Sequence, residues 1–263
     1  MKLGLDSVID RVSAIPSGSP LKRLLRTPLN YIPSGLRVPV IHGPLQGKRW
    51  IVGSSIHACW WGTYEVAESR LMAQRLQPGN VFFDIGAQAG YHTMYASSLV
   101  GPSGRVFAFE PAPLNLANLK QHLLMNHLSN TLVIDAAVSN VNGVSYFDCA
   151  DSPVAGHLSA SGGLAVRTIS LDQEIDSGAL PEPDYIKIDA EGAELNILEG
   201  ARKMLRRRLP ILSLETHQWL PQFATIRHDC IRFLLELGYQ VSEADPALKH
   251  SDTHLCAFRP TQQ

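Results

Sequence analysis

From Asn80 onward, short apolar runs alternate with longer segments in which apolar residues recur at helical spacing. The apolar runs predict strands at 80–86, 104–110, 131–138, 143–148, 184–189, 210–217, 239–244 and 254–259. The helical spacing predicts helices at 91–100, 114–127, 193–205 and 226–237. Strands that alternate with helices usually pair in parallel and are covered by helices on both faces. The alternation therefore predicts an α/β fold with a doubly wound, mostly parallel sheet.

Length and composition set limits on the whole chain. Its 263 residues are 45% hydrophobic and 18% charged, which is ordinary for a soluble protein with a sizeable core. We expect one large domain over 56–263, preceded by an N-terminal extension over 1–55. The net charge of −1 gives no reason to expect a nucleic-acid partner, since binding of phosphates needs a basic face.

The cysteines and the N-terminus bear on the compartment. Cys59, Cys149, Cys230 and Cys256 are scattered without a C-x-x-C pair, which disfavours a zinc site and a disulfide scaffold. No signal-peptide stretch or apolar run of membrane length is seen, so we expect a cytoplasmic protein. The basic amphipathic stretch Ser19–Leu29 fits either a surface arm or peripheral membrane contact. Exchange of this arm between subunits would give a homo-oligomer.

A charge and two glycines follow directly on the apolar run that begins at Val81. Asp84 stands near the end of this strand, and Gly86 and Gly90 frame the turn into the next helix. In doubly wound sheets, ligands bind at the carboxyl ends of the strands, and glycine lets a ligand approach the backbone closely. A carboxylate here suits a ligand that carries an ammonium group, although a helix N-cap is the alternative for Asp84.

The next strand also ends on an acid, Glu110, in the stretch FAFEP. An acid in this place hydrogen-bonds ribose hydroxyls in nucleotide-binding folds, whereas a surface acid before a turn is the alternative. A ribose and an ammonium group together describe S-adenosylmethionine. An NAD-dependent sugar oxidoreductase stays open, although the third glycine of the dinucleotide motif is missing. A non-catalytic subunit with the same nucleotide-binding fold is the other alternative.

Five stretches form a specific set along the chain: FFDIGAQAGYHTMYAS, GRVFAFEPAPLNLANLKQHLLMN, IDAAVSN, YIKIDAEGAELNILEGA and PILSLETH. Together with CWWGTYE upstream, they resemble the FkbM family of class I S-adenosylmethionine-dependent methyltransferases over about 61–217. The most specific piece is KIDAEGAE, from Lys187 to Glu194. The resemblance implies a seven-stranded sheet whose last strand is antiparallel. It also implies O-methylation, commonly of sugar or polyketide hydroxyls.

The resemblance further implies where the cofactor lies. Residues at the carboxyl ends of the first three strands would line it: Asp84, Gly86, Ala87 and Gly90 at the methionine and ribose end, Glu110 at the ribose, Pro111 beside the adenine, and Asp135 and Ala136 near the adenine edge. In this family the segment with Tyr64 and Glu65 can fold over the cofactor, and packing against the sheet is the alternative. His92 is either a polar contact to the cofactor or a helix-start residue.

Methyl transfer to a hydroxyl requires alignment with the sulfonium carbon and removal of the hydroxyl proton. Four side chains near the carboxyl ends of two later strands are candidates: Asp189, Glu191, Glu215 and His217. In one hypothesis His217 is the base, and Asp189 or Glu215 orients it. In the other, Asp189, Glu215 and His217 bind Mg²⁺ or Mn²⁺, which polarises the hydroxyl.

Three charged residues around these candidates have simpler interpretations as well. Lys187 either neutralises the neighbouring carboxylates or contacts an acidic substrate. Glu194 is expected at the start of the following helix, where the helix dipole favours a negative charge. Glu199 is expected on the same helix as an exposed partner of Lys203.

The methyl acceptor is expected to be a small molecule or glycan with a free hydroxyl. Trp60, Trp61 and Trp219 are candidates for stacking on a sugar ring, and packing in the core is the alternative for each. We expect the acceptor pocket to be built from the N-terminal extension and the segments 155–163 and 218–225.

Overall fold

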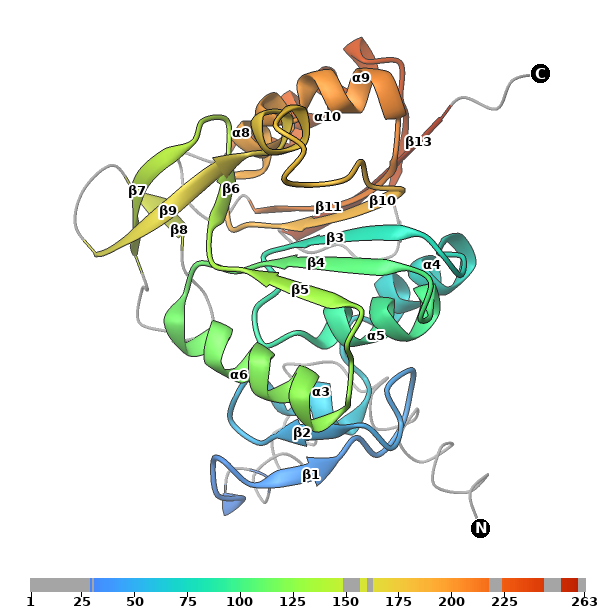
Figure 1. Cartoon of the computed structure of the whole chain (residues 1–263), viewed down its shortest axis with the longest axis vertical. Helices are drawn as coiled ribbons and strands as arrows, with labels where there is room; N and C mark the ends of the chain where they lie inside the picture. The colour runs from blue at the N-terminus through green and yellow to red at the C-terminus, as the bar shows by residue number, and fades with distance from the viewer. Residues whose placement is uncertain are drawn as a thin grey trace. The chain divides into compact units, whose positions relative to one another are not determined.

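The structure is a computed structural model, and it describes residues 29, 31–148, 157–159, 163–217, 224–243 and 252–259. It divides into two compact units, Met1–Val66 and Ala67–Gln263 (Figure 1). Apart from Leu29, the amphipathic stretch Ser19–Leu29 lies outside the described residues. None of the described helices is both long and apolar enough to cross a membrane.

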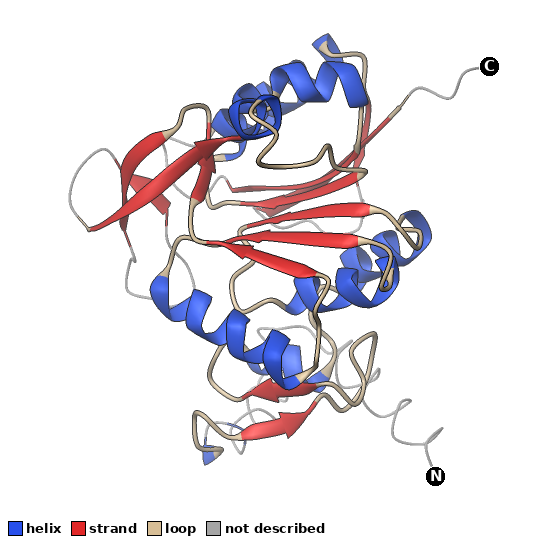
Figure 2. Ribbon diagram, viewed as in Figure 1, coloured by secondary structure: helices blue, strands red, loops and turns tan. Residues whose placement is uncertain are grey.

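A sheet of seven strands, counted among the described residues, forms the centre of the second unit (Figure 2). In spatial order the strands are β12 (Gln240–Glu243), β13 (Asp252–Phe258), β11 (Ile211–His217), β10 (Tyr185–Asp189), β3 (Val81–Ile85), β4 (Arg105–Phe109) and β5 (Thr131–Ile134). Neighbouring strands from β11 to β5 pair in parallel, and β13 is antiparallel to both of its neighbours. The expected mostly parallel, seven-stranded sheet with one antiparallel strand is therefore confirmed.

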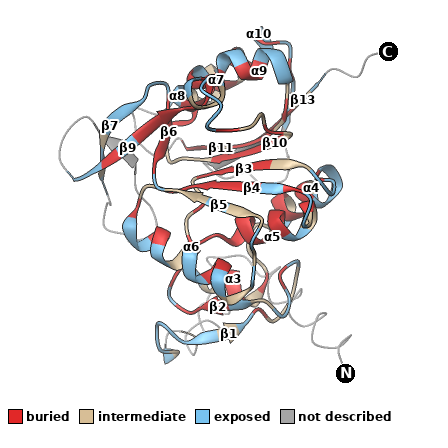
Figure 3. Ribbon diagram, viewed as in Figure 1, coloured by how far each residue is buried: buried red, intermediate tan, exposed pale blue. Residues whose placement is uncertain are grey.

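Helices cover both faces of this sheet, as the alternating sequence pattern predicts. One side carries α4 (Val66–Arg75), α5 (Tyr91–Val100) and α6 (Pro113–Met125). The other side carries α7 (Leu171–Asp176), α8 (Glu194–Gly200), α9 (Arg202–Arg208) and α10 (Ile226–Glu236) (Figures 1 and 3). Apolar cores fill both sides, and the central strands are buried almost throughout (Figure 3).

The sheet face toward α4 and α5 is apolar at the amino ends of β3 and β10 and carries charged side chains toward their carboxyl ends. Phe82 and Tyr185 are register partners in the apolar core at the amino ends of β3 and β10. Two residues further on, on the same face, Asp84 and Lys187 are partners. Asp189 follows at the end of β10. The alternation of the pleat thus gathers charged groups at the carboxyl edge of an apolar sheet.

The segment 131–138, expected to be one strand, is two. After β5 the backbone N–H of Ala136 donates to the carbonyl of Ile134 at 3.0 Å, which ends the ladder in a tight turn. The chain then enters β6 (Ala137–Ser139), which belongs to a separate four-stranded sheet in the order β6-β9-β7-β8. The strand expected at 143–148 is confirmed as β7 (Gly143–Asp148), but it lies in this second sheet. The remaining strands of this second sheet are β8 (His157–Ser159) and β9 (Leu164–Ser170).

The helix expected over 193–205 is also divided, into α8 and α9. The carboxylate of Asp172 in α7 explains the second start, because it accepts hydrogen bonds from the backbone N–H groups of Lys203 (2.8 Å) and Met204 (2.9 Å). These groups have no partner within their own first helical turn. A side chain from another element therefore caps α9.

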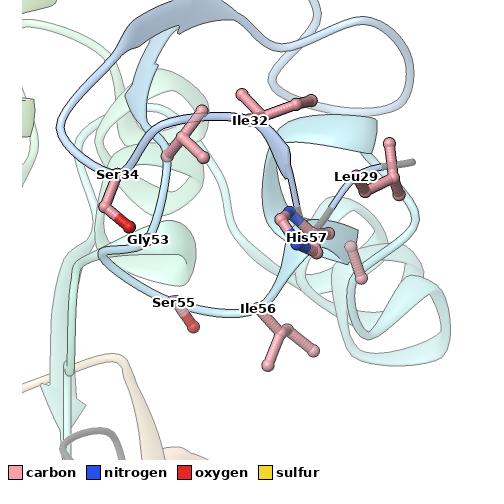
Figure 4. A pocket seen from close by; sticks show the side chains of 9 residues that line it. Leu29, Ile32, Ser34, Gly53, Ser55, Ile56 and His57 are labelled. Atoms are coloured by element: carbon pink, nitrogen blue, oxygen red, sulfur yellow. The ribbon is translucent and has the colours of Figure 1, made fainter. Parts of the chain in front are cut away.

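The first unit contains an antiparallel pair, β1 (Arg37–Pro39) and β2 (Arg49–Ile51), followed by α3 (His57–Trp61). Trp50 and Val40 are buried in it. A cavity of about 460 Å³ in this unit is lined by Leu29, Ile32, Ser34, Val52, Gly53, Ser55, Ile56, His57 and Ala58 (Figure 4). The indole N–H of Trp60 donates to His57 Nδ1 at 3.1 Å and so holds this ring.

Candidate active site

The glycine turn after β3 lies against the end of β10. Gly86 has a φ of 79°, and a Cβ built on it would stand 1.8 Å from the backbone oxygen of Asp189. Only glycine fits this approach, because a carbonyl of the backbone cannot move aside as a flexible side chain can. Gly90, with a φ of 91°, then leads into α5. The turn expected to hold the cofactor is thus packed directly on the strand that carries the catalytic candidates.

Asp84 is buried at the carboxyl end of β3. Its Oδ2 accepts a hydrogen bond from the Thr93 hydroxyl at 2.5 Å, whereas its Oδ1 has no hydrogen-bond partner among the described residues. Burial raises the pKa of Asp84, and the positive charge of Lys187 acts in the opposite direction. An unpartnered buried carboxylate oxygen is costly and is available to a ligand that donates hydrogen bonds.

Glu110, directly after β4, is buried and accepts hydrogen bonds on both oxygens. Oε1 accepts from the backbone N–H of Ala112 at 2.8 Å and from Asn115 at 3.4 Å, and Oε2 accepts from the N–H of Gln88 at 2.8 Å. Burial raises the pKa of Glu110 to about 7, although these donors act to lower it. Since each carboxylate oxygen has about two acceptor sites, Oε2 keeps capacity for a hydroxyl donor.

A buried histidine stands at the end of β11. His217 Nδ1 lies 2.8 Å from Glu194 Oε1, and Nε2 lies 3.6 Å from both Asp189 Oδ1 and Glu191 Oε2. Burial alone would lower the pKa of His217, but the hydrogen bond with Glu194 and the negative charges of Asp189 and Glu191 raise it to about 10. The neighbouring carboxylates therefore favour the protonated form of His217.

The same strand ends place further charges beside this ring. Lys187 Nζ forms an ion pair with Asp189 Oδ2 at 3.0 Å, one of the arrangements expected from the sequence. Asp189 and Glu215 are register partners on β10 and β11. Asp189, Glu215 and His217 each offer one ligand atom, and these atoms lie within 4.8 Å of one another. Two carboxylate oxygens and an imidazole nitrogen at this spacing are groups that could hold a metal ion.

The other residues expected at the cofactor differ in how far they are buried. Ala87, His92 and Ala136 are buried, Pro111 is half-buried and Asp135 is exposed. Tyr64 and Glu65 belong to the first unit, so their contact with the cofactor stays a prediction.

Two of the three tryptophans expected to stack on a sugar ring lie in the first unit. Trp60 is buried in the first unit, and Trp61 is partly buried there with its ring centroid 5.6 Å from that of Trp60. Trp219 lies outside the described residues, as do most of 155–163 and 218–225.

The expected pair between Glu199 and Lys203 is wrong. Glu199 is in α8 and Lys203 is in α9, so the spacing of four residues does not place them on one continuous helix. Lys203 instead pairs with Asp176 at 3.1 Å.

Four contacting residues were missed by reasoning from the sequence: Gln88, Thr93, Asn115 and Glu194. Glu194 does begin α8, as expected, but its side chain is fully buried against His217. The signal available in the sequence was the place of Glu194 inside KIDAEGAE, the most specific piece of the family resemblance.

Comparison with known proteins assigns the chain. The family model described as Methyltransferase FkbM domain matches residues 84–241, which include Asp84, Glu110, Asp189 and His217. The chain belongs to this family. The resemblance found in the sequence is therefore confirmed.

Among curated relatives, the chain is 30% identical to hexuronic acid methyltransferase AglP of Haloferax volcanii over 142 residues, which is 52% of this chain and 56% of AglP. It is 25% identical to 31-O-demethyl-FK506 methyltransferase FkbM of Streptomyces tacrolimicus over 71% of this chain and 83% of that protein. It is 26% identical to 2-O-methyltransferase NoeI of Sinorhizobium fredii over 50% and 61%. The chain thus spans little more than half the length of AglP.

The fold also matches solved structures. A methyltransferase FkbM from Methylobacillus flagellatus superposes with a TM-score of 0.52 at 19% identity, over 73% of this chain and 51% of that one. An rRNA-methylase structure from Clostridium thermocellum gives a TM-score of 0.51 at 14% identity, over 74% and 95%. At these identities the matches establish the methyltransferase type of fold.

Proposed function

We propose that this FkbM-family chain is an S-adenosylmethionine-dependent O-methyltransferase that acts on a hydroxyl of a sugar, glycolipid or secondary metabolite. The observation that carries this proposal is the buried, unpartnered Oδ1 of Asp84 beside a glycine turn that is packed on Asp189. The ammonium group of the cofactor would satisfy Asp84, and the ribose hydroxyls would donate to Glu110 Oε2.

Contacts of the cofactor with Asp84 and Glu110 would place its other atoms near the glycine turn. Gly86, Ala87 and Gly90 would line its methionine and ribose end. Further contacts are proposed for His92, Pro111, Asp135, Ala136 and Glu65. The cofactor is already activated, so what this chain must supply is alignment of the acceptor and removal of its proton.

In the first mechanism, His217 accepts the hydroxyl proton on Nε2. Its raised pKa favours the protonated form in the ligand-free protein, so it would act as a base after a positive charge enters the site. The sulfonium of the cofactor carries such a charge and would lower the pKa of an imidazolium nearby. Lys187 and the carboxylates of Asp189, Glu191 and Glu215 would then balance the charge that develops.

In the second mechanism, Asp189, Glu215 and His217 hold Mg²⁺ or Mn²⁺. The ion would polarise the acceptor hydroxyl and lower the pKa of that group. Two observations favour this version: the three ligand atoms lie within 4.8 Å of one another, and His217 Nδ1 faces the carboxylate of Glu194. Histidines that bind metals through one nitrogen usually donate from the other to a carboxylate or carbonyl.

Removal of metal separates the two mechanisms. The purified chain is treated exhaustively with EDTA, and methyl transfer is measured before and after Mg²⁺ or Mn²⁺ is restored. Loss of activity with recovery on re-addition supports the metal version, and full activity in EDTA eliminates it.

The names of the relatives guide the choice of acceptor. AglP is named for a hexuronic acid, NoeI for a 2-O position and FkbM for 31-O-demethyl-FK506. We therefore propose a hydroxyl of a glycan or of a similarly polyhydroxylated small molecule as the acceptor.

The test combines binding and transfer. Isothermal titration with S-adenosylmethionine, S-adenosylhomocysteine and NAD identifies the cofactor. A screen with radiolabelled methyl donor covers hexuronic acid glycosides, other sugars and 31-O-demethyl-FK506. Binding of the two adenosyl compounds, followed by label in one acceptor class, supports the proposal. Binding of NAD alone would restore the oxidoreductase alternative, and binding without any transfer would favour the non-catalytic one.

A further inference from the structure

Glu194 holds together two parts of the site. It is fully buried at the first position of α8. Its Oε1 accepts the backbone N–H of Gly192 at 3.0 Å and lies 2.8 Å from His217 Nδ1. One carboxylate oxygen thus contacts both the turn that follows β10 and the ring at the end of β11.

The turn after β10 contains two residues in left-handed backbone conformations. Glu191 has a φ of 49° and Gly192 a φ of 102°. The left-handed region is unfavourable for a residue with a side chain, so Glu191 stays there because its surroundings hold it. This turn puts Glu191 Oε2 within 3.6 Å of His217 Nε2. By accepting the N–H of Gly192, Glu194 fixes the turn as well as the ring.

We propose that Glu194 is a positioning residue for the site, which acts by fixing the ring of His217. Oε1 already accepts the N–H of Gly192, and a carboxylate oxygen can only accept, so the arrangement places the proton between Oε1 and His217 on Nδ1. Nε2 is then the nitrogen presented to Asp189 and Glu191. This inference rests on the proposed function, and it holds for both mechanisms, since each uses Nε2.

Spectroscopy of the histidine ring tests this without knowledge of the acceptor. The full chain is labelled with ¹⁵N-histidine, and the His217 ring signals are assigned by their loss in His217→Ala. In the unsubstituted protein we expect a slowly exchanging, downfield Nδ1–H proton. This signal is expected to disappear in Glu194→Ala and to persist in Glu194→Gln, because the amide oxygen still accepts from Nδ1–H and from Gly192.

Glu199→Ala is the matched control, because Glu199 is an exposed acid of the same helix whose carboxylate contacts Asn140. It should leave the His217 signals unchanged. The proposal is overturned if the Nδ1–H signal survives in folded Glu194→Ala or is lost in Glu194→Gln. Should Glu194→Ala fail to fold, an unprotonated Nδ1 in the unsubstituted protein would overturn it equally.

Titration with S-adenosylhomocysteine separates this inference from the proposed function. Failure of the unsubstituted chain to bind this compound counts against the methyltransferase proposal and leaves the histidine spectrum interpretable. Binding within about threefold of the unsubstituted value in Glu194→Gln, together with an unchanged Nδ1–H signal, supports both.

Discussion

At the scale of single residues, the two nitrogens of His217 have different tasks. Nδ1 is engaged by Glu194, and Nε2 faces Asp189 and Glu191. We predict that His217→Ala lowers the rate of methyl transfer by about 10² to 10⁴-fold, because the group that activates the hydroxyl is lost under either mechanism. Affinity for S-adenosylhomocysteine should stay within about threefold. Near-normal turnover of the radiolabel in this variant would exclude His217 from catalysis.

Glu110 makes stability depend on pH. Its pKa of about 7 in the folded protein lies above the ordinary 4.5, so between these values the folded state keeps a proton that the unfolded state has released. The free energy of unfolding of the ligand-free protein should therefore fall as pH rises from 4.5 to 7, by up to about 3 kcal/mol from this residue.

Urea denaturation across this pH range checks the prediction, with Glu110→Gln as the comparison. The variant should lack this part of the slope. Identical slopes for the two proteins would show that Glu110 does not carry the raised pKa.

The glycine turn offers a matched pair of substitutions. Gly86 and Gly178 both have a φ of 79°, but a Cβ on Gly178 meets nothing within 4 Å. Gly178→Ala should therefore cost only the strain of the left-handed region, about 1 kcal/mol. Gly86→Ala adds a collision with the Asp189 carbonyl, so its loss of unfolding free energy should be clearly larger and binding of S-adenosylhomocysteine should be lost. Equal losses in urea denaturation would contradict the close packing of the turn on β10.

At the scale of elements, α9 depends on a cap from another helix. Asp172→Ala should lower the free energy of unfolding by about 1 to 2 kcal/mol, because the N–H groups of Lys203 and Met204 lose their acceptor. Asp176→Ala removes only an exposed ion pair with Lys203 and should cost less than about 0.5 kcal/mol. Urea denaturation compares the two. A smaller effect for Asp172 than for Asp176 would contradict the capping role.

The sequence pattern predicts some elements well and misses two breaks between neighbouring elements. The periodicity placed α5 and the strands β3, β4, β10 and β11 well, because each is a long, strongly patterned segment bounded by turn residues. It missed the break between β5 and β6 and the break between α8 and α9. These breaks depend on a backbone contact at Ala136 and on the distant cap Asp172, and no local pattern encodes either.

At the scale of the whole molecule, strand order decides which residues meet. The sequence could predict that Asp84, Glu110, Asp189 and His217 lie at carboxyl ends, because parallel strands end at one edge. The side-chain contacts of Thr93 with Asp84 and of Glu194 with His217 could not be predicted from spacing alone.

The central claim is that the turn after β3 holds S-adenosylmethionine with its sulfonium toward the cluster at the ends of β10 and β11. A crystal structure of the full chain with S-adenosylhomocysteine tests this most directly. The account predicts the amino group within hydrogen-bond distance of Asp84, the ribose hydroxyls on Glu110 and the sulfur facing the side of Asp189 and His217. Density for the ligand elsewhere, or with its sulfur turned away from these residues, would contradict the account.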